Sequence, residues 1–186
     1  MKKTDIIKLD KILNDFPESL GKLIKESFES KNYRKKIDAR NTLVKKDKTI
    51  VPPMHKLLES ESNLIRRKAI KIVELFADRR SIPVFINLLD DDEFEIRWIA
   101  AEGLVRIGRY SILPLLESVR YGDSSFIHNK AVYHALLGLL NEKEKENLLS
   151  LFHSLDDYHE LGETAPVEAS QAIKAIYKRK SRVKPS

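Results

Sequence analysis

The chain has 186 residues, of which 42% are hydrophobic and 33% charged, so it is long enough to bury a sizeable core and is typical of a single domain. The absence of cysteine excludes a disulfide framework, a thiol nucleophile, an iron–sulfur cluster and a zinc site with Cys ligands. With a formal net charge of +6, few Gly and Pro, and no apolar run near the roughly 18 residues that span a bilayer, the composition favours an all-helical cytoplasmic protein without membrane contact.

Two amphipathic helices are predicted at the N-terminus, over residues 5–16 and 17–28. Their apolar residues recur at helical spacing, as Ile6, Leu9 and Leu13 and then as Leu20, Leu23 and Ile24. We expect residues 1–30 to cap one end of a helical domain.

An internal repeat of 31 residues follows. Pro52, Pro83 and Pro114 stand 31 residues apart, and other positions keep the same spacing. The aligned columns are Ile65, Ile96 and Ile127; Arg66, Arg97 and His128; Ala69, Ala100 and Ala131; and Val73, Leu104 and Ala135. The first copy fits with a shift of one residue, which sets Tyr33-Arg34 over Ile65-Arg66 and replaces the helix alanine by Ile37 or Asp38.

Each copy is predicted to be a helix, a short turn and a second helix. Ile96, Ala100, Leu104 and Ile107 lie on one face of a helix, which Gly108 ends as a left-handed cap. A proline six residues later falls in the first turn of the next helix, where its missing N–H costs nothing. A lone pair of such helices cannot bury its apolar face, so the pairs must stack.

The stretches 95–116 and 63–89 carry a family resemblance. Glu95-Ile96-Arg97-Trp98-Ile99-Ala100-Ala101 followed by Ile112-Leu113-Pro114-Leu115-Leu116 resembles a HEAT repeat of the short, phycobilisome-lyase type. The resemblance implies an all-α solenoid of stacked antiparallel helix pairs. We expect one domain over 1–180, with about four repeats over 31–155, a C-terminal helix over 166–180 and a basic disordered tail over 181–186.

The most repeated polar feature is an acid before the first helix of a copy and an arginine just inside it. Arg66, Arg97 and Asp92 are predicted to form a structural ladder that ties adjacent repeats through hydrogen bonds. His128 replaces the arginine in the fourth copy, where we expect the ladder to weaken.

No catalytic or metal-binding pattern is complete. His134 is predicted to face the core, and the polar loop with His153, Asp156, Asp157, His159, Glu160 and Glu163 meets no fixed ligand spacing. The sequence has no Gly-x-Ser-x-Gly motif and no Gly-rich phosphate loop. We therefore expect no enzyme activity, no metal and no cofactor, and a bilin-lyase role would rest on the family name alone.

The second helices line the concave side of a HEAT solenoid, so their outward side chains form the predicted partner-binding row. This row comprises His55, Lys56, Glu59, Asn87, Asp90, Asp91, Glu117, Ser118 and Tyr121. The row is mixed in charge, and Trp98 is predicted to pack away from it against Phe94 and Ala101.

These patterns favour a monomeric, non-enzymatic scaffold that binds another protein on the concave face. The alternative is a nucleic-acid-binding module that uses two basic patches, 31–48 and 174–184. Residues 31–48 hold eight basic and two acidic side chains, whereas 174–186 hold six basic and none acidic. Residues 1–173 sum to zero charge, so the positive charge is local and weak evidence for nucleic acid.

Overall fold

The computed structural model describes residues 1–121, 125–157 and 164–182, and it is all-α. The structure is 83% helical, and no strand occurs in those three stretches. The α-helices are α1 Lys3–Leu13, α2 Glu18–Glu29, α3 Tyr33–Val44, α4 Val51–Leu58, α5 Asn63–Val73, α6 Ile82–Asn87, α7 Phe94–Ile107, α8 Ile112–Tyr121, α9 Phe126–Leu139, α10 Glu142–Glu146, α11 Leu149–Asp156 and α12 Thr164–Arg182.

Short 3-10 turns join several of these helices. They are η1 Lys48–Ile50, η2 Glu74–Phe76, η3 Arg79–Ser81, η4 Leu88–Asp90 and η5 Arg109–Ser111. The final helix ends at Arg182, two residues beyond the predicted end at 180. Of the predicted disordered tail, residues 183–186 lie outside the described residues.

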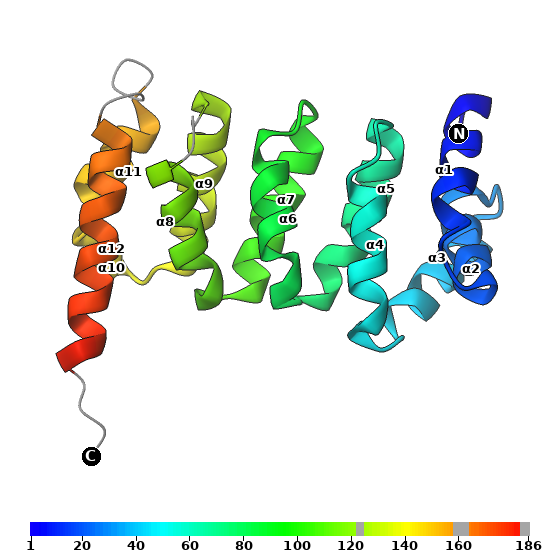
Figure 1. Ribbon diagram of the computed structural model, residues 1–186, viewed down its shortest axis with the longest axis horizontal. Coiled ribbons are helices and arrows are strands. Elements are labelled where there is room, and N and C mark those ends of the chain that lie inside the picture. Colours follow the sequence, from blue (N-terminus) through cyan, green and yellow to red (C-terminus); the bar gives the residue numbers. More distant parts are fainter. Residues whose placement is uncertain (122–124, 158–163, 183–186) are drawn as a thin grey trace.

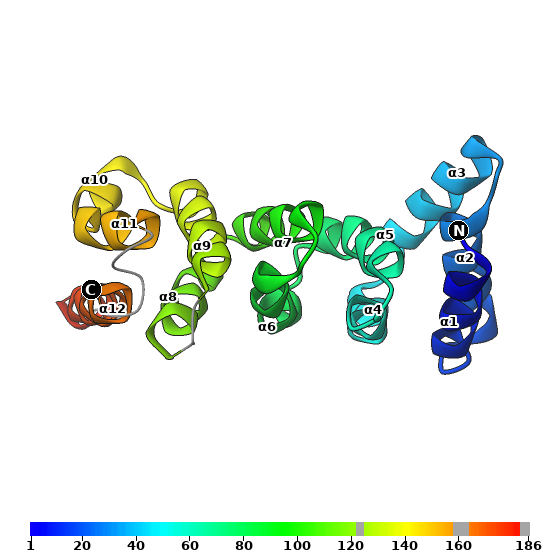
Figure 2. The ribbon, with the colours of Figure 1, turned by 90° about the horizontal axis from the view of Figure 1, so that it is seen from above.

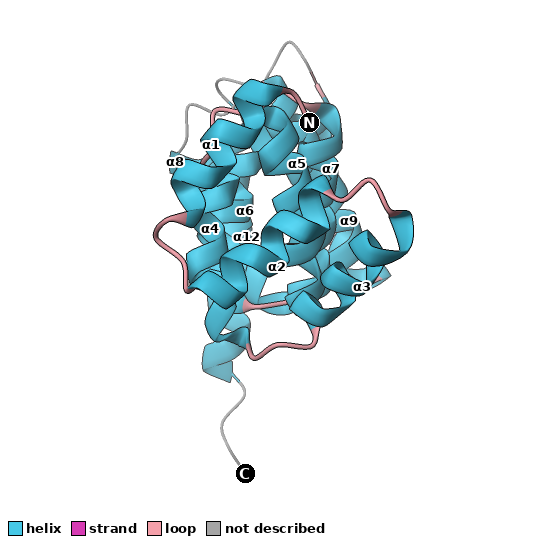
Figure 3. Cartoon of the chain, turned by 90° about the vertical axis from the view of Figure 1, so that its right-hand side faces the viewer, coloured by secondary structure: helices cyan, strands magenta, loops and turns pink. Residues whose placement is uncertain are grey.

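The helices stand side by side along the long axis of the molecule, from α1–α3 at one end to α10–α12 at the other (Figure 1). Seen from above, they form two layers (Figure 2). One layer holds α4, α6, α8 and α12, and the other holds α3, α5, α7, α9 and α11. From the N-terminal end, α1, α2 and α3 lie nearest the viewer (Figure 3). A single connected hydrophobic core, from Leu9 to Ile173, runs between the layers.

Local sequence sets the helix ends. Side-chain oxygens of Asn32, Ser62, Ser125 and Asn141 accept hydrogen bonds from backbone N–H groups in the first turns of α3, α5, α9 and α10. Pro52 and Pro83 lie in the first turns of α4 and α6. Gly108 ends α7 with a φ of 86°. These signals explain why the predicted helix–turn–helix alternation appears in the structure.

The 31-residue spacing holds between α5 and α7. Five buried positions of α5 reappear 31 residues later in α7; they are Ile65, Ala69, Ile70, Ile72 and Val73, matched by Ile96, Ala100, Ala101, Gly103 and Leu104. Both helices therefore present the same face to the core.

The spacing changes at both ends of this region. In α9 the buried residues are His128, Asn129, Val132, Ala135 and Leu136, so the core face lies one residue later than the 31-residue period requires. The 31-residue period aligns Ile127 with the buried Ile96 and His128 with Arg97. In the structure Ile127 is exposed, and His128 occupies the buried position that corresponds to Ile96. In α3 the buried residues are Ala39 and Leu43, which lie 30 residues before Ala69 and Val73. The predicted alignment of Tyr33 with Ile65 is therefore wrong, because Tyr33 is exposed.

Candidate functional site

The first part of the predicted row lies on α4. His55 is half-buried, and its Nε2 lies 2.9 Å from the Oγ of Ser81. Burial lowers the pKa of His55, an effect that the charge of Asp78 opposes. Lys56 is exposed and forms an ion pair of 3.0 Å with Asp15 on the neighbouring N-terminal segment. Glu59 is exposed just past the end of α4.

The next part of the row borders a groove between α6 and α8. Asn87, Glu117 and Ser118 line this shallow groove of about 550 Å³ together with Arg79 and several apolar side chains. The apolar lining is Ile82, Pro83, Ile86 and Pro114. An apolar floor with an amide, a carboxylate and a guanidinium at its edge suits a polypeptide segment. Tyr121 is exposed at the end of α8 and does not line the groove.

Asp91 does not belong to an exposed row. Its side chain is only 4% exposed and receives two hydrogen bonds from Arg66, at 2.7 Å from Nε and 3.0 Å from the second terminal nitrogen. Burial alone would raise the pKa of Asp91, but the hydrogen bonds from Arg66 and from the Glu93 backbone lower it below its usual value. The same contact raises the pKa of Arg66. Asp91 is therefore a packing residue.

The other members of the predicted ladder lie around this pair. Arg66 also contacts the carboxylate of Asp92 at 2.7 Å, and Asp92 is 80% exposed. Arg97 donates from one terminal nitrogen to the backbone carbonyls of Asp91 and Asp92, at 2.6 and 3.1 Å. Arg66 of α5 thus reaches the turn before α7, and Arg97 of α7 holds the same turn from the other side.

Asp90 is also engaged rather than free. Its Oδ2 lies 2.7 Å from Nδ1 of His128, and its Oδ1 accepts a hydrogen bond of 2.7 Å from Ser125. Nε2 of His128 lies 3.0 Å from Oγ of Ser118, so an aspartate, a histidine and a serine meet. The Ser118 hydroxyl, however, donates to the carbonyl of Leu115 within α8. The three side chains tie η4, α8 and α9 together, and this geometry does not prepare Ser118 as a nucleophile.

The histidines and the polar loop do not form a metal site in the described chain. No group of three His, Asp or Glu side chains with a suitable arrangement occurs there. Asp156 pairs with Lys130, while His159, Glu160 and Glu163 lie outside the described residues. His134 is only half-buried and pairs with Glu102 at 2.7 Å, because Ala135 takes the core position that was predicted for it.

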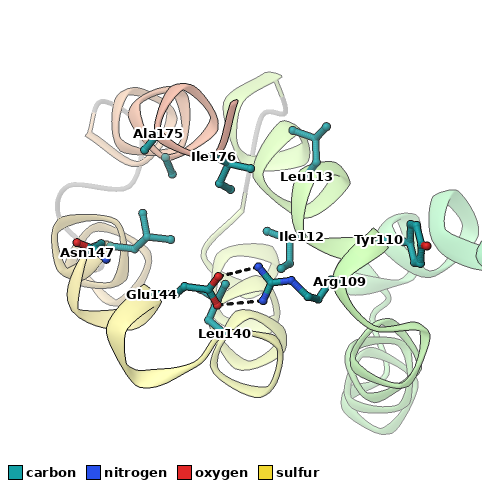
Figure 4. Close-up of a pocket in the computed structure, with 11 residues that line it drawn as sticks. Arg109, Tyr110, Ile112, Leu113, Leu140, Glu144, Asn147, Ala175 and Ile176 are labelled. Atoms are coloured by element: carbon teal, nitrogen blue, oxygen red, sulfur yellow. Dashed lines mark hydrogen bonds and ion pairs between the residues drawn. The ribbon is translucent and has the colours of Figure 1, made fainter. Parts of the chain in front are cut away.

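A pocket that the sequence did not indicate lies between α8, α10 and α12. It has a volume of about 500 Å³, within the range of ligand pockets, and its walls are mainly apolar, with Ile112, Leu113, Leu140 and Ile176 among them. Arg109 lies at its edge and makes two parallel hydrogen bonds to Glu144, at 2.6 and 3.0 Å (Figure 4). These residues are separated by up to 67 positions in the chain, so no local pattern could have revealed the pocket.

The described parts of the chain form an all-helical protein of about twelve helices with several open grooves. The sequence matches no protein-family model, and no curated protein matches it. Within the described residues, no helix is both long and apolar enough to cross a membrane.

Proposed function

We propose that this protein is a non-enzymatic scaffold built from stacked HEAT-like helix pairs, and that it binds a partner protein on the layer of α4, α6 and α8. The single observation that carries this proposal is the groove between α6 and α8. There Asn87, Glu117 and Ser118, from two copies of the repeat, border one apolar floor. The identical spacing of the buried residues in α5 and α7 supports the stacked-repeat arrangement.

The partner-binding row of this proposal is narrower than the sequence predicted. It consists of Asn87, Glu117 and Ser118 at the groove, flanked by Lys56 on α4. Asp91 is excluded because its side chain is buried against Arg66, and Asp90 is excluded because it does not line the groove and its carboxylate contacts His128 and Ser125. The partner is then a polypeptide segment with an apolar residue for the floor and a basic residue near Glu117.

The test is a comparison of variants in affinity purification from the source cell. The double variant Asn87→Lys/Glu117→Lys places positive charge at the groove, and Lys22→Glu/Lys143→Glu serves as the control on exposed positions elsewhere. We expect the first variant to lose a partner that the wild type and the control retain, at an unchanged Tm. Crosslinking from a photoreactive residue at position 87 should then reach the same partner.

The proposal fails if the partner is retained by the groove variant and lost when Lys178, Arg179 and Lys180 are replaced by Gln. The basic C-terminal segment would then be the functional element. A monomeric state is part of the proposal, and light scattering at working concentration tests it directly.

A further inference from the structure

The opposite layer of the molecule carries two neighbouring grooves of a different character. The first is lined mainly by α3 and α5, and the second by α7 and α9. Figure 2 shows these four helices in one layer. Phe94 and Glu95, adjacent at the start of α7, line the second and the first groove respectively. Neither groove includes a residue of the row proposed above to bind protein.

The first groove, of about 360 Å³, is cationic. Five basic side chains line it, against one carboxylate, that of Glu95; they are Lys36, Arg40, Arg67, Lys68 and Lys71. Glu95 pairs with both Arg67 and Lys71, which leaves the lining strongly positive. Two of these cations come from the basic stretch 31–48, but the other three come from α5, where the sequence suggested no patch. Tyr33 lies exposed in the same lining.

The cations in this groove are close enough to repel one another. The pKa of Lys68 is lowered, first because its ammonium is partly buried and then because Lys36 lies nearby, although the charge of Glu29 opposes this effect. An anion bound between these side chains would relieve that repulsion. The ammonium of Lys68 already donates to the carbonyl of Phe28, and Arg40 donates to the carbonyl of Lys71 at 3.2 Å, so both cations are held in place.

The second groove, of about 270 Å³, is aromatic. Phe94 is 68% exposed and Trp98 is 47% exposed, although large aromatic side chains are usually buried. Their ring centroids lie 6.1 Å apart, and the indole of Trp98 lies 4.1 Å from the imidazole of His134. Arg97 and Lys130 flank these rings. The predicted packing of Trp98 against Phe94 is present. His134 covers part of the indole and Arg97 lies over the Phe94 ring, yet both rings stay partly exposed.

Cations in one groove and open aromatic faces in the next are the two features with which proteins hold single-stranded nucleic acid. The basic groove follows the phosphates, and successive bases stack on the aromatic rings. A duplex keeps its base faces inside the stack, so it would leave Phe94 and Trp98 unused. An acidic polypeptide would also pair with the cations, so polyglutamate is the competing ligand in the experiment below.

We propose that the α3–α5 and α7–α9 grooves form one binding surface for single-stranded nucleic acid, with phosphates held at Lys36, Arg40 and Arg67 and bases stacked at Phe94 and Trp98. This surface is separate from the protein-binding groove and lies on the other layer. In place of the two patches of the sequence-based alternative, it uses one surface whose charged and aromatic side chains come from α3, α5, α7 and α9.

The experiment measures the binding of labelled oligo(U) RNA and oligo(dT) DNA of about 20 nucleotides, longer than typical single-strand sites, by fluorescence anisotropy. We expect affinity to fall steeply between about 50 and about 200 mM salt. The variant Lys36→Gln/Arg40→Gln should weaken binding and reduce the slope of log affinity against log salt by about 1.4, which is two phosphate contacts. The charge-matched control Lys22→Gln/Lys143→Gln should leave the affinity and the salt slope unchanged.

Trp98→Ala tests the aromatic part of the surface. It should weaken binding at least about fivefold while leaving the salt slope unchanged, because it removes stacking and no charge. Trp98→Phe should restore most of the affinity, which a merely structural defect would not explain. Circular dichroism confirms that each variant is folded.

Three results would overturn the proposal. One is the absence of salt-dependent binding to either oligonucleotide. Another is an equal loss in the control double variant, which would mean diffuse attraction to the whole protein. The third is binding of polyglutamate or of a duplex as tight as that of the single strand, with no effect of Trp98→Ala. None of these results tests the groove between α6 and α8, so each proposal can be contradicted without affecting the other.

Discussion

Nδ1 of His128 lies 2.7 Å from Oδ2 of Asp90, and the imidazole is almost completely buried between α8 and α9. A buried histidine stands here because the core face of α9 is displaced by one residue from that of α7. The side chain replaces an apolar contact by polar contacts to Asp90 and Ser118, one at each ring nitrogen.

His128→Ala should lower the free energy of unfolding by about 2–3 kcal/mol, because it leaves a cavity and removes both hydrogen bonds. His153 on α11 is exposed and provides the control, since His153→Ala should change stability by less than about 0.5 kcal/mol. Urea denaturation of the two variants measures the difference. Equal stability of the two variants would contradict the buried position of His128.

Asp91→Ala should destabilise the protein by about 1–3 kcal/mol, because it leaves the largely buried Nε of Arg66 without an acceptor, while the terminal nitrogens keep Asp92 and the Ser60 carbonyl. Asp92 touches the same guanidinium but is mostly exposed, so Asp92→Ala should cost less than about 1 kcal/mol. Thermal unfolding followed by circular dichroism compares them. If both variants lose the same stability, the assignment of Asp91 to packing is wrong.

Asp78 gives a prediction about pH. Hydrogen bonds from the Arg80 side chain, more than any other cause, lower the pKa of Asp78 from 3.8 to about 2. A carboxyl with a lowered pKa stabilises the folded state above the unfolded pKa, and this stabilisation is lost as pH falls through the folded pKa. The wild type should therefore lose about 2 kcal/mol more than Asp78→Asn between pH 5 and pH 2, measured by urea denaturation at each pH. Parallel losses in both proteins would contradict the lowered pKa.

Ala77 stands where the repeat has Gly108 one copy later, and both have positive φ, at 46° and 86°. An alanine in the left-handed region is strained, so Ala77→Gly should raise the free energy of unfolding by up to about 1 kcal/mol despite the greater freedom of glycine in the unfolded chain. Gly108→Ala should destabilise for the same reason. A gain in stability from Gly108→Ala would refute this account.

Gly103 and Gly21 should respond oppositely to alanine. A Cβ at Gly103 would lie 2.5 Å from a ring carbon of the buried Phe85, whereas at Gly21 the nearest atom would lie at 3.7 Å, an ordinary contact. Gly103→Ala should therefore cost about 1–3 kcal/mol, and Gly21→Ala should stabilise α2 by about 0.5–1 kcal/mol. Chemical denaturation of both variants tests the close approach of α6 and α7.

The sequence could predict much of the helical plan. The i, i+4, i+7 spacing in 65–76 and 96–107 predicted α5 and α7, and Gly108 predicted the end of α7. Pro83 and Pro114 predicted the starts of the helices that follow, α6 and α8. These features depend on residues within a few positions of one another, so they can be read along the chain. The partner-binding row stays a prediction: Asn87, Glu117 and Ser118 line one groove, whereas the side chain of Asp91 is buried.

Only the tertiary structure decided which of two adjacent residues in α3 and α9 faces the core. Ala39 is buried rather than Ile37 or Asp38, and His128 rather than Ile127, because the neighbouring helices and partners such as Asp90 select the face. The same holds for the two grooves on the layer of α3, α5, α7 and α9, since Lys36 and Arg67 belong to different helices and meet only when these helices pack. Helical periodicity is encoded by nearby residues and looks the same when the buried face moves by one residue. Which side chains are buried, and which charged side chains come together, depends on residues that lie far away in the sequence.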